Sequence, residues 1–185
     1  DRGNDCQRAA DCSTLLPAAG TPGRPVSAMR IVVQRVAKAS LTVDGNPRGS
    51  IGRGLVVLAG FAAGDAAADL SYLAGKVLSL RVFEDAAGKM NLPLADVDGE
   101  LMVVPQFTLY GDCRRGNRPD LTAAAPPGPA RGLYEEFVRM LDGRVRRLVR
   151  GDFAASMLVE IHNDGPVTLI LSSRAERDPA GRDAE

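Results

Sequence analysis

The sequence predicts an α+β protein in which barrel-like mixed β-sheets are flanked by two helices. Three observations lead to this class. Some runs alternate apolar and polar residues with the two-residue period of a half-buried strand, and others are apolar throughout, as central strands are. Two further segments repeat apolar residues at the spacing of a helix face. Because the strand-like runs outnumber the helical ones, sheets should supply most of the core.

Both ends of the chain lack the periodicity of packed elements. Residues 1–28 are rich in Ala, Gly, Pro and charged residues, so we expect a disordered leader or a non-native extension before a natural start at Met29. Residues 174–185 are charged and include Pro and Gly, and we expect a disordered tail there. One domain over residues 29–173 remains.

The first half of this domain predicts three strands and a helix. Odd positions from 31 to 43 are mostly apolar, which indicates a strand with Arg35 as its exception. A turn at 44–47 leads to a short strand ending at Ile51, and the apolar run 55–61 suits a central strand. Asp65 can cap a helix that has apolar residues at 70, 73, 77 and 80 on one face.

The second half contains further strands and one more helix. The run 101–104 is typical of a buried strand, and a helix starting near Pro129 turns residues 133, 137, 140 and 141 inward. Strands are then expected at 144–149, 157–161 and 167–171.

Charge is balanced overall but not locally. The formal net charge is +0, yet nine arginines and no lysine occur between Arg114 and Arg150 against four acidic residues. Such a segment can be a solvated surface, or it can contact phosphates through the planar donors of arginine. The sequence leaves both interpretations open.

Cysteine and histidine usage excludes several classes of site. Cys6, Cys12 and Cys113 suggest no disulfide framework, and the only histidine, His162, rules out a Cys/His cluster with zinc spacing. His162 falls on the polar face of its strand, which indicates a solvent-facing residue rather than a catalytic base. No run reaches the roughly 18 apolar residues of a membrane span. We therefore expect a cytoplasmic protein without a metal, a cofactor or membrane association.

The segment Asn163-Asp164-Gly165-Pro166-Val167-Thr168 lies between two apolar runs. A hairpin here would usually have a two-residue Asn-Gly or Asp-Gly turn, but this Gly is followed by Pro. An X-Pro bond adopts the cis form at low cost, and Gly gives the neighbouring carbonyls unusual freedom of direction. The segment is therefore either a plain structural turn or a rigid steric element.

Several motifs in register resemble one family. They are Pro105-Gln106-Phe107-Thr108-Leu109, the segment 163–168, Gly88-Lys89-Met90-Asn91-Leu92, Arg115-Gly116-Asn117-Arg118-Pro119 and Phe153-Ala154-Ala155-Ser156-Met157, together with 29–36 and 124–127. In order and spacing they closely resemble the D-aminoacyl-tRNA deacylases, from Met29 to about Ser173.

This resemblance implies a homodimer that hydrolyses the ester of D-aminoacyl-tRNA and of mischarged glycyl-tRNA. It implies a cis Gly165-Pro166 pair that projects from one subunit into the pocket of the other and rejects L-residues by steric clash. The other substrate-binding candidates are Asn163, Pro105 and Met157, and the tRNA-binding candidates are Arg114, Arg115 and Arg118. Aminoacyl-tRNA is the expected partner, and no DNA partner is expected.

The residues offer no Ser-His-acid arrangement, so the chemistry must come from other groups. Backbone N–H groups of Gln106, Phe107 and Thr108 can stabilise an oxyanion, while the ribose hydroxyl of the substrate orients water. Alternatively, the Thr108 hydroxyl is a nucleophile, as in a general esterase, but it then needs an adjacent base.

Pro105 departs from the resembling family, whose motif typically begins with Ser. This change removes a hydroxyl and a backbone N–H. If those groups are indispensable, the chain is a non-hydrolytic tRNA-binding homologue. We favour retained activity, because Gln106 and Phe107 keep their N–H groups.

Overall fold

The computed structural model describes residues 28–114 and 116–174, so most of the predicted leader and tail, together with Arg115, lie outside the described residues. The main sheet contains β1 (Arg30–Val43), β2 (Asn46–Ile51), β3 (Gly54–Gly60), β6 (Glu100–Pro105), β7 (Leu148–Arg150) and β8 (Met157–Ser172). The strands β4 (Phe83–Glu84) and β5 (Met90–Leu92) form a hairpin. The helices are α1 (Ala67–Ser79) and α2 (Pro127–Leu141), with short 3-10 turns η1 (Ala95–Val97) and η2 (Phe107–Tyr110).

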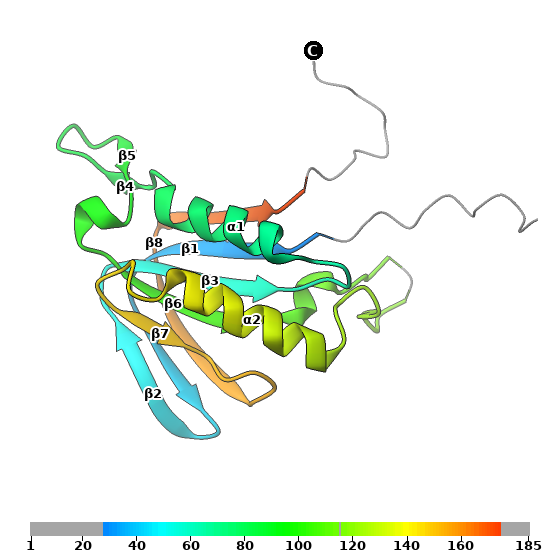
Figure 1. The fold of residues 1–185 in the computed structure, drawn as a ribbon. Helices are drawn as coiled ribbons and strands as arrows, with labels where there is room; N and C mark the ends of the chain where they lie inside the picture. Colours follow the sequence, from blue (N-terminus) through cyan, green and yellow to red (C-terminus); the bar gives the residue numbers. More distant parts are fainter. Residues whose placement is uncertain (1–27, 115, 175–185) are drawn as a thin grey trace, which may run out of the picture.

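The main sheet is mixed and curls towards a barrel, which confirms the predicted fold class (Figure 1). β1 is antiparallel to β2, β3 and β8, whereas β6 is parallel to both β3 and β7. The curl brings β2 close to β7. A Cβ atom added at Gly49 of β2 would lie only 3.2 Å from the side chain of Val149 in β7.

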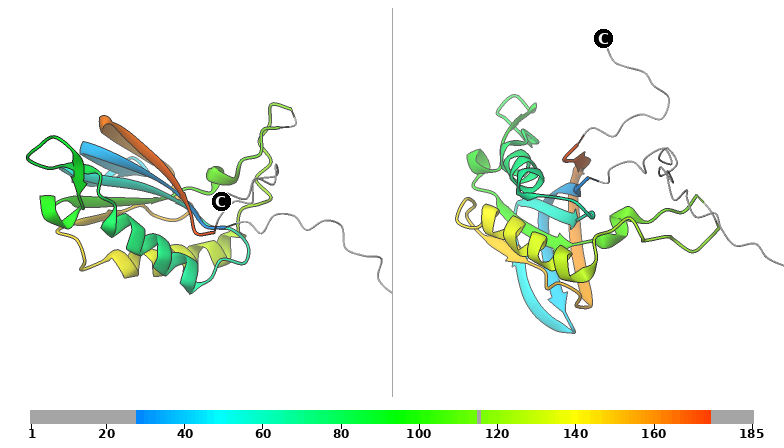
Figure 2. Two further views of the ribbon diagram at one scale, coloured as in Figure 1. Left: turned by 90° about the horizontal axis from the view of Figure 1, so that it is seen from above. Right: turned by 45° about the vertical axis from the view of Figure 1, so that its right-hand side comes forward.

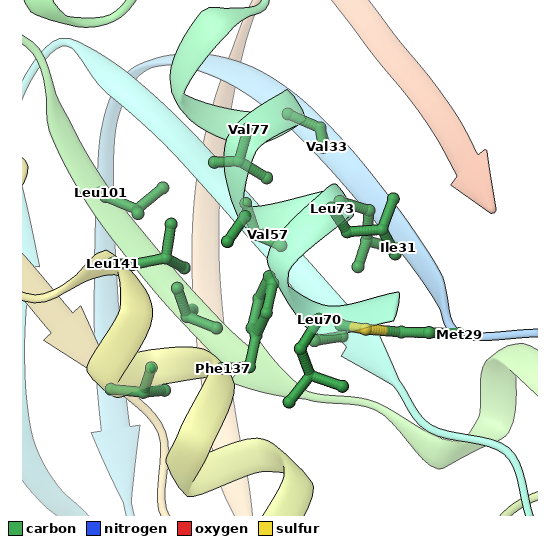
Figure 3. Packing of buried hydrophobic residues seen from close by; sticks show 14 of the residues in the cluster. Met29, Ile31, Val33, Val57, Leu70, Leu73, Val77, Leu101, Phe137 and Leu141 are labelled. Carbon is green, nitrogen blue, oxygen red and sulfur yellow. The ribbon is translucent and has the colours of Figure 1, made fainter. Parts of the chain in front are cut away.

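Both helices cover the same face of the sheet, as Figure 2 shows from above. Leu70, Leu73 and Val77 of α1 and Phe137 and Leu141 of α2 are fully buried, and Figure 3 shows them converging over the strands. Burying such a side chain stabilises the fold by about 1.5 to 3 kcal/mol. The apolar faces predicted for the two helices are thus confirmed, apart from the partly exposed positions at their edges.

The start of α1 differs from the prediction. Asp65 does not cap this helix, because its carboxylate accepts the N–H of Ala62 at 2.7 Å and the N-cap position is Ala66. Asp69 in the first turn accepts the Ala66 N–H instead, at 2.9 Å, and is itself paired with Arg174 at 2.7 Å. Arg174, assigned to the tail by the sequence, is therefore attached to α1.

The predicted strand at 31–43 is confirmed as β1, and it serves two cores. Ile31 and Val33 pack beneath the helices, whereas Leu41 and Val43 pack in a second cluster with Met102 and Val104 of β6. The pairing register with β8 shifts on both sides of Val36, which marks where β1 passes from one core to the other.

The C-terminal strands differ from the expected pattern. Instead of separate strands at 157–161 and 167–171, the chain forms one continuous strand, β8, which includes residues 163–168. Both parts of β8 pair with β1 in the same antiparallel sense, so the chain never reverses direction. β7 also begins later than predicted, at Leu148, because the chain is still turning after α2, with the Arg144 N–H donating to the Leu141 carbonyl.

Candidate active site

The first part of the candidate site is the 3-10 turn η2, directly after β6. The N–H of Gln106 donates to the Ala59 carbonyl at 2.7 Å, so the prediction that this group binds an oxyanion is wrong. The chain then leaves the sheet and η2 begins at Phe107. The first N–H groups of a helical turn have no partner within it, which leaves those of Phe107 and Thr108 as candidate donors.

The Thr108 side chain is exposed and is bonded to its neighbour. The Gln106 side-chain amide donates to the Thr108 hydroxyl oxygen. That hydroxyl therefore keeps its own proton to donate. Within residues 28–114 and 116–174, no carboxylate or histidine is bonded to Thr108. Among these residues Thr108 therefore has no hydrogen-bonded base of the kind that a threonine nucleophile needs.

Pro105 and Met157, both substrate-binding candidates, meet at one position beside η2. A Cβ atom added at Gly151 would lie 2.8 Å from the Met157 Sδ and 3.0 Å from the Pro105 Cδ. The two side chains thus pack on Gly151 and form an apolar border. Phe107, the first residue of η2, is exposed. The missing N–H of Pro105 falls at the end of β6, where proline is tolerated.

The second part is the segment 163–168 within β8. Its Gly165–Pro166 peptide is cis, in agreement with the resemblance, and Gly165 has φ +120°. The Asn163 side chain closes the segment: its Oδ1 accepts the Val167 N–H at 3.1 Å and its Nδ2 donates to the Thr168 hydroxyl at 2.9 Å. Asn163 thus shapes the segment rather than pointing freely outward.

Arg35 is the residue that sequence reasoning missed. Its side chain is buried beneath this segment, where it donates to the Asp164 carbonyl at 3.1 Å and to the Val82 carbonyl at 2.7 Å. It also pairs with the carboxylates of Asp164 at 3.3 Å and Glu84 at 3.9 Å. The signal was present in the sequence, because Arg35 alone breaks the apolar alternation of β1.

The two parts lie at opposite ends of the sheet. A Cβ atom at Gly60 would lie 2.8 Å from the Gln106 carbonyl oxygen, so η2 sits at the Gly60 end of β3. Asn163 pairs with Val36, which faces Gly54 at the other end. The six steps along the strand from Arg30 to Val36 span about 20 Å at 3.3 Å per residue. Arg35 links the β4–β5 hairpin to segment 163–168 through Glu84 and Asp164, and in Figure 1 this hairpin lies far from the loop after β6.

The arginine-rich segment is also divided between these ends. Arg114 and Arg118 lie in the loop that follows η2, which Figure 2 shows projecting from the body of the protein. Asp112 holds the guanidinium of Arg114 and raises its pKa. Arg118 is exposed, whereas Arg146, at the other end, pairs with Asp98 at 3.1 Å. The position of Arg115 lies outside the described residues.

Two absences among the described residues bear on other kinds of site. No group of three His, Cys, Asp or Glu residues in residues 28–114 and 116–174 is arranged to hold a metal ion. In the same part of the chain, neither helix has the length and apolar character needed to cross a membrane.

Comparison with known proteins yields consistent matches. The family model described as D-Tyr-tRNA(Tyr) deacylase matches residues 32–172. The chain is 54% identical over 145 residues to a D-aminoacyl-tRNA deacylase of Clostridium botulinum (strain Eklund 17B / Type B), covering 78% of this chain and 97% of that protein. It is 55% identical over 146 residues to one of Anaeromyxobacter dehalogenans (strain 2CP-C), covering 79% and 98%.

Two solved structures share the fold. A protein described as c-Myc DNA Unwinding Element Binding Protein is 42% identical, with a TM-score of 0.74 over 79% of this chain and 99% of that one. A probable eukaryotic D-amino acid tRNA deacylase is 18% identical, with a TM-score of 0.66 over 78% and 98% of the two chains. At that identity the second match speaks for the fold alone.

Proposed function

The chain belongs to the D-aminoacyl-tRNA deacylase family, and from this membership and the placement of its motifs we infer how it hydrolyses the ester bond of D-aminoacyl-tRNA. The products are the free D-amino acid and free tRNA. The observation that carries the activity is the 54% identity over 97% of the length of a protein that bears this name. The division of roles described next rests on the geometry of η2 and of segment 163–168.

The N–H groups of Phe107 and Thr108 are the proposed oxyanion donors. Attack on the ester places a negative charge on the carbonyl oxygen, and donors already fixed in place stabilise it without rearrangement. One good donor of this kind contributes about 3 to 4 kcal/mol. Gln106 has a supporting role, since its N–H anchors the turn to Ala59 and its side chain holds the Thr108 hydroxyl.

Water activation is assigned to the substrate. The ribose hydroxyl next to the ester lies beside the carbonyl and can orient a water molecule at high effective concentration. Thr108, without a bonded base among the described residues, positions the substrate by donating its hydroxyl proton. No metal or cofactor takes part in this scheme.

Selection of the D-configuration is assigned to Gly165 and Pro166. A D-residue or glycine can turn hydrogen toward this pair, whereas an L-residue would turn its side chain toward it and clash. The pair can reject L-residues only if it is held rigidly, and Arg35 and Asn163 hold its segment through the hydrogen bonds described above. Because nothing in this scheme reads the side chain, glycyl-tRNA and several D-aminoacyl-tRNAs are expected substrates.

The distance between the two parts supports a homodimer. Since η2 and Gly165 lie about 20 Å apart along β1, they act on one ester only if they come from two copies of the chain. Two features of β8 support this assembly. Among the described residues β8 pairs only with β1, and Leu158 and Ile170 on its outer face are 64% and 77% exposed.

The tRNA is proposed to approach from the Gly60 end, where the loop after η2 carries Arg114 and Arg118. Arg118 is exposed and has no partner among the described residues, so it is available to a phosphate. Arg114, oriented by Asp112, contributes a fixed positive charge. A cytoplasmic location and the absence of a DNA partner stay predictions.

Release of labelled D-tyrosine from tRNA tests the proposal, with L-tyrosyl-tRNA and glycyl-tRNA assayed in parallel. We expect the D-tyrosyl and glycyl esters to be cleaved and the L-tyrosyl ester to be spared. Binding of tRNA without any turnover would instead support the non-hydrolytic alternative raised by Pro105. Cleavage of small esters without tRNA would support a general esterase.

A further inference from the structure

Tyr110 is the last residue of η2, and its buried side chain attaches this turn to the sheet. The ring is 4% exposed, and the hydroxyl lies 2.7 Å from the Ala28 carbonyl oxygen and 3.1 Å from that of Gly60. Burial raises the pKa of Tyr110, so the hydroxyl stays protonated and remains a donor. One side chain thus joins η2 to Ala28, two residues before β1, and to Gly60, the last residue of β3.

The contacts around Tyr110 leave η2 little room to shift. A Cβ atom at Gly60 would lie 3.0 Å from the Tyr110 ring, so the ring rests directly on the end of β3. The Arg30 guanidinium lies 5.4 Å from the ring centre and donates to the Leu109 carbonyl at 3.5 Å. Tyr110 is therefore held by contacts with both β3 and Arg30.

We propose that Tyr110 is a positioning residue for the catalytic turn, an inference that rests on the proposed function of η2. Phe107 and Thr108, which carry the two candidate donors, belong to the same four-residue turn as Tyr110. Loss of its hydroxyl bonds lets the turn move relative to the sheet and misdirects both N–H groups. Small displacements of this kind reduce rates strongly, because donors must be directed at the developing charge.

The chain contains a matched control. Tyr134 of α2 is 3% exposed, and its hydroxyl likewise lies close to two carbonyl oxygens, those of Val103 at 3.0 Å and Gly151 at 2.8 Å. Burial raises the pKa of Tyr134 as well. Tyr110→Phe and Tyr134→Phe thus remove the same atom from similar surroundings, but only the first touches η2.

The experiment compares these two variants with wild type at equal folded fraction. For Tyr110→Phe we expect kcat on D-tyrosyl-tRNA to fall about tenfold with KM within twofold, while Tyr134→Phe keeps kcat within twofold. The amide NMR shifts of Phe107 and Thr108 should change in Tyr110→Phe alone. Unchanged kcat and amide shifts in Tyr110→Phe, or equal effects in both variants, would overturn the proposal. A wild type without turnover would contradict the proposed function, and the amide shifts would still test the role of Tyr110.

Discussion

Gly165→Ala is the substitution that most directly probes the proposed steric exclusion of L-residues by Gly165 and Pro166. An added Cβ atom would lie 2.8 Å from the Arg35 Nη2 and 2.9 Å from the Val167 Cγ2, closer than side-chain carbons normally approach. The residue also has φ +120°, which L-residues rarely adopt. Backbone strain of this kind costs about 1 to 3 kcal/mol, and overpacking adds about 1 to 3 kcal/mol.

Gly45→Ala separates the two costs. Gly45 also has positive φ, at +80°, but an added Cβ atom there would meet nothing within 4 Å. This control should lose only about 1 kcal/mol of unfolding free energy, since it carries strain without crowding. Gly165→Ala should lose about 3 kcal/mol in the same denaturant titration.

The activity assay follows kcat/KM on D-tyrosyl-tRNA and glycyl-tRNA at matched folded fraction. Because the methyl group and the displaced segment both intrude on the space for the substrate, Gly165→Ala should lower both values at least 100-fold, about 2.7 kcal/mol. Gly45→Ala should stay within twofold of wild type. A folded Gly165→Ala protein with wild-type activity on both substrates would refute the placement of Gly165 at the pocket.

Four further predictions test other parts of the scheme. Phe107→Pro removes one oxyanion donor at a turn position that tolerates proline, so kcat should fall about 100- to 1000-fold, whereas Phe107→Ala, which keeps the N–H, should fall far less. Pro105→Ser should change the deacylation rate by less than about tenfold, and a gain of several hundredfold would identify a crippled enzyme. D-Tyrosyl-tRNA ending in 2′-deoxyadenosine, esterified on the 3′ oxygen, should be cleaved far more slowly, and equal rates would remove the ribose hydroxyl from the mechanism. Arg118→Glu should reduce the salt dependence of tRNA affinity by about one phosphate contact, and an unchanged slope would return Arg118 to a solvated surface role.

Local patterns sufficed to predict most of the elements. The alternation from 31 to 43 and the apolar run at 55–61 predicted β1 and β3, since both depend on which residues face the core. The continuity of β8 was missed because the turn chemistry of Gly165-Pro166 resembles that of a hairpin. Only pairing along the full length of β1 keeps this segment within one strand.

The errors at the candidate site also arise from partners distant in sequence. The N–H of Gln106 is occupied because β6 pairs with β3, which places Ala59 beside it. Arg35 reads as an isolated exception in β1, and its partners Val82 and Asp164 lie 47 and 129 residues away. Neither contact has a local signature, so both emerge only from the folded chain.

A heterodimer test addresses the central claim, that each active site combines η2 of one subunit with Gly165-Pro166 of the other. One subunit carries Phe107→Pro and the other Gly165→Ala, each with its own affinity tag, so that the mixed dimer can be purified. If each site is shared between subunits, one of the two pockets of the heterodimer contains both substitutions and the other pocket contains neither. The heterodimer should then recover about half of the wild-type activity on D-tyrosyl-tRNA, although both parent homodimers are nearly inactive. A heterodimer as inactive as its parents would contradict the claim, as would a wild-type monomer that cleaves D-tyrosyl-tRNA with full selectivity.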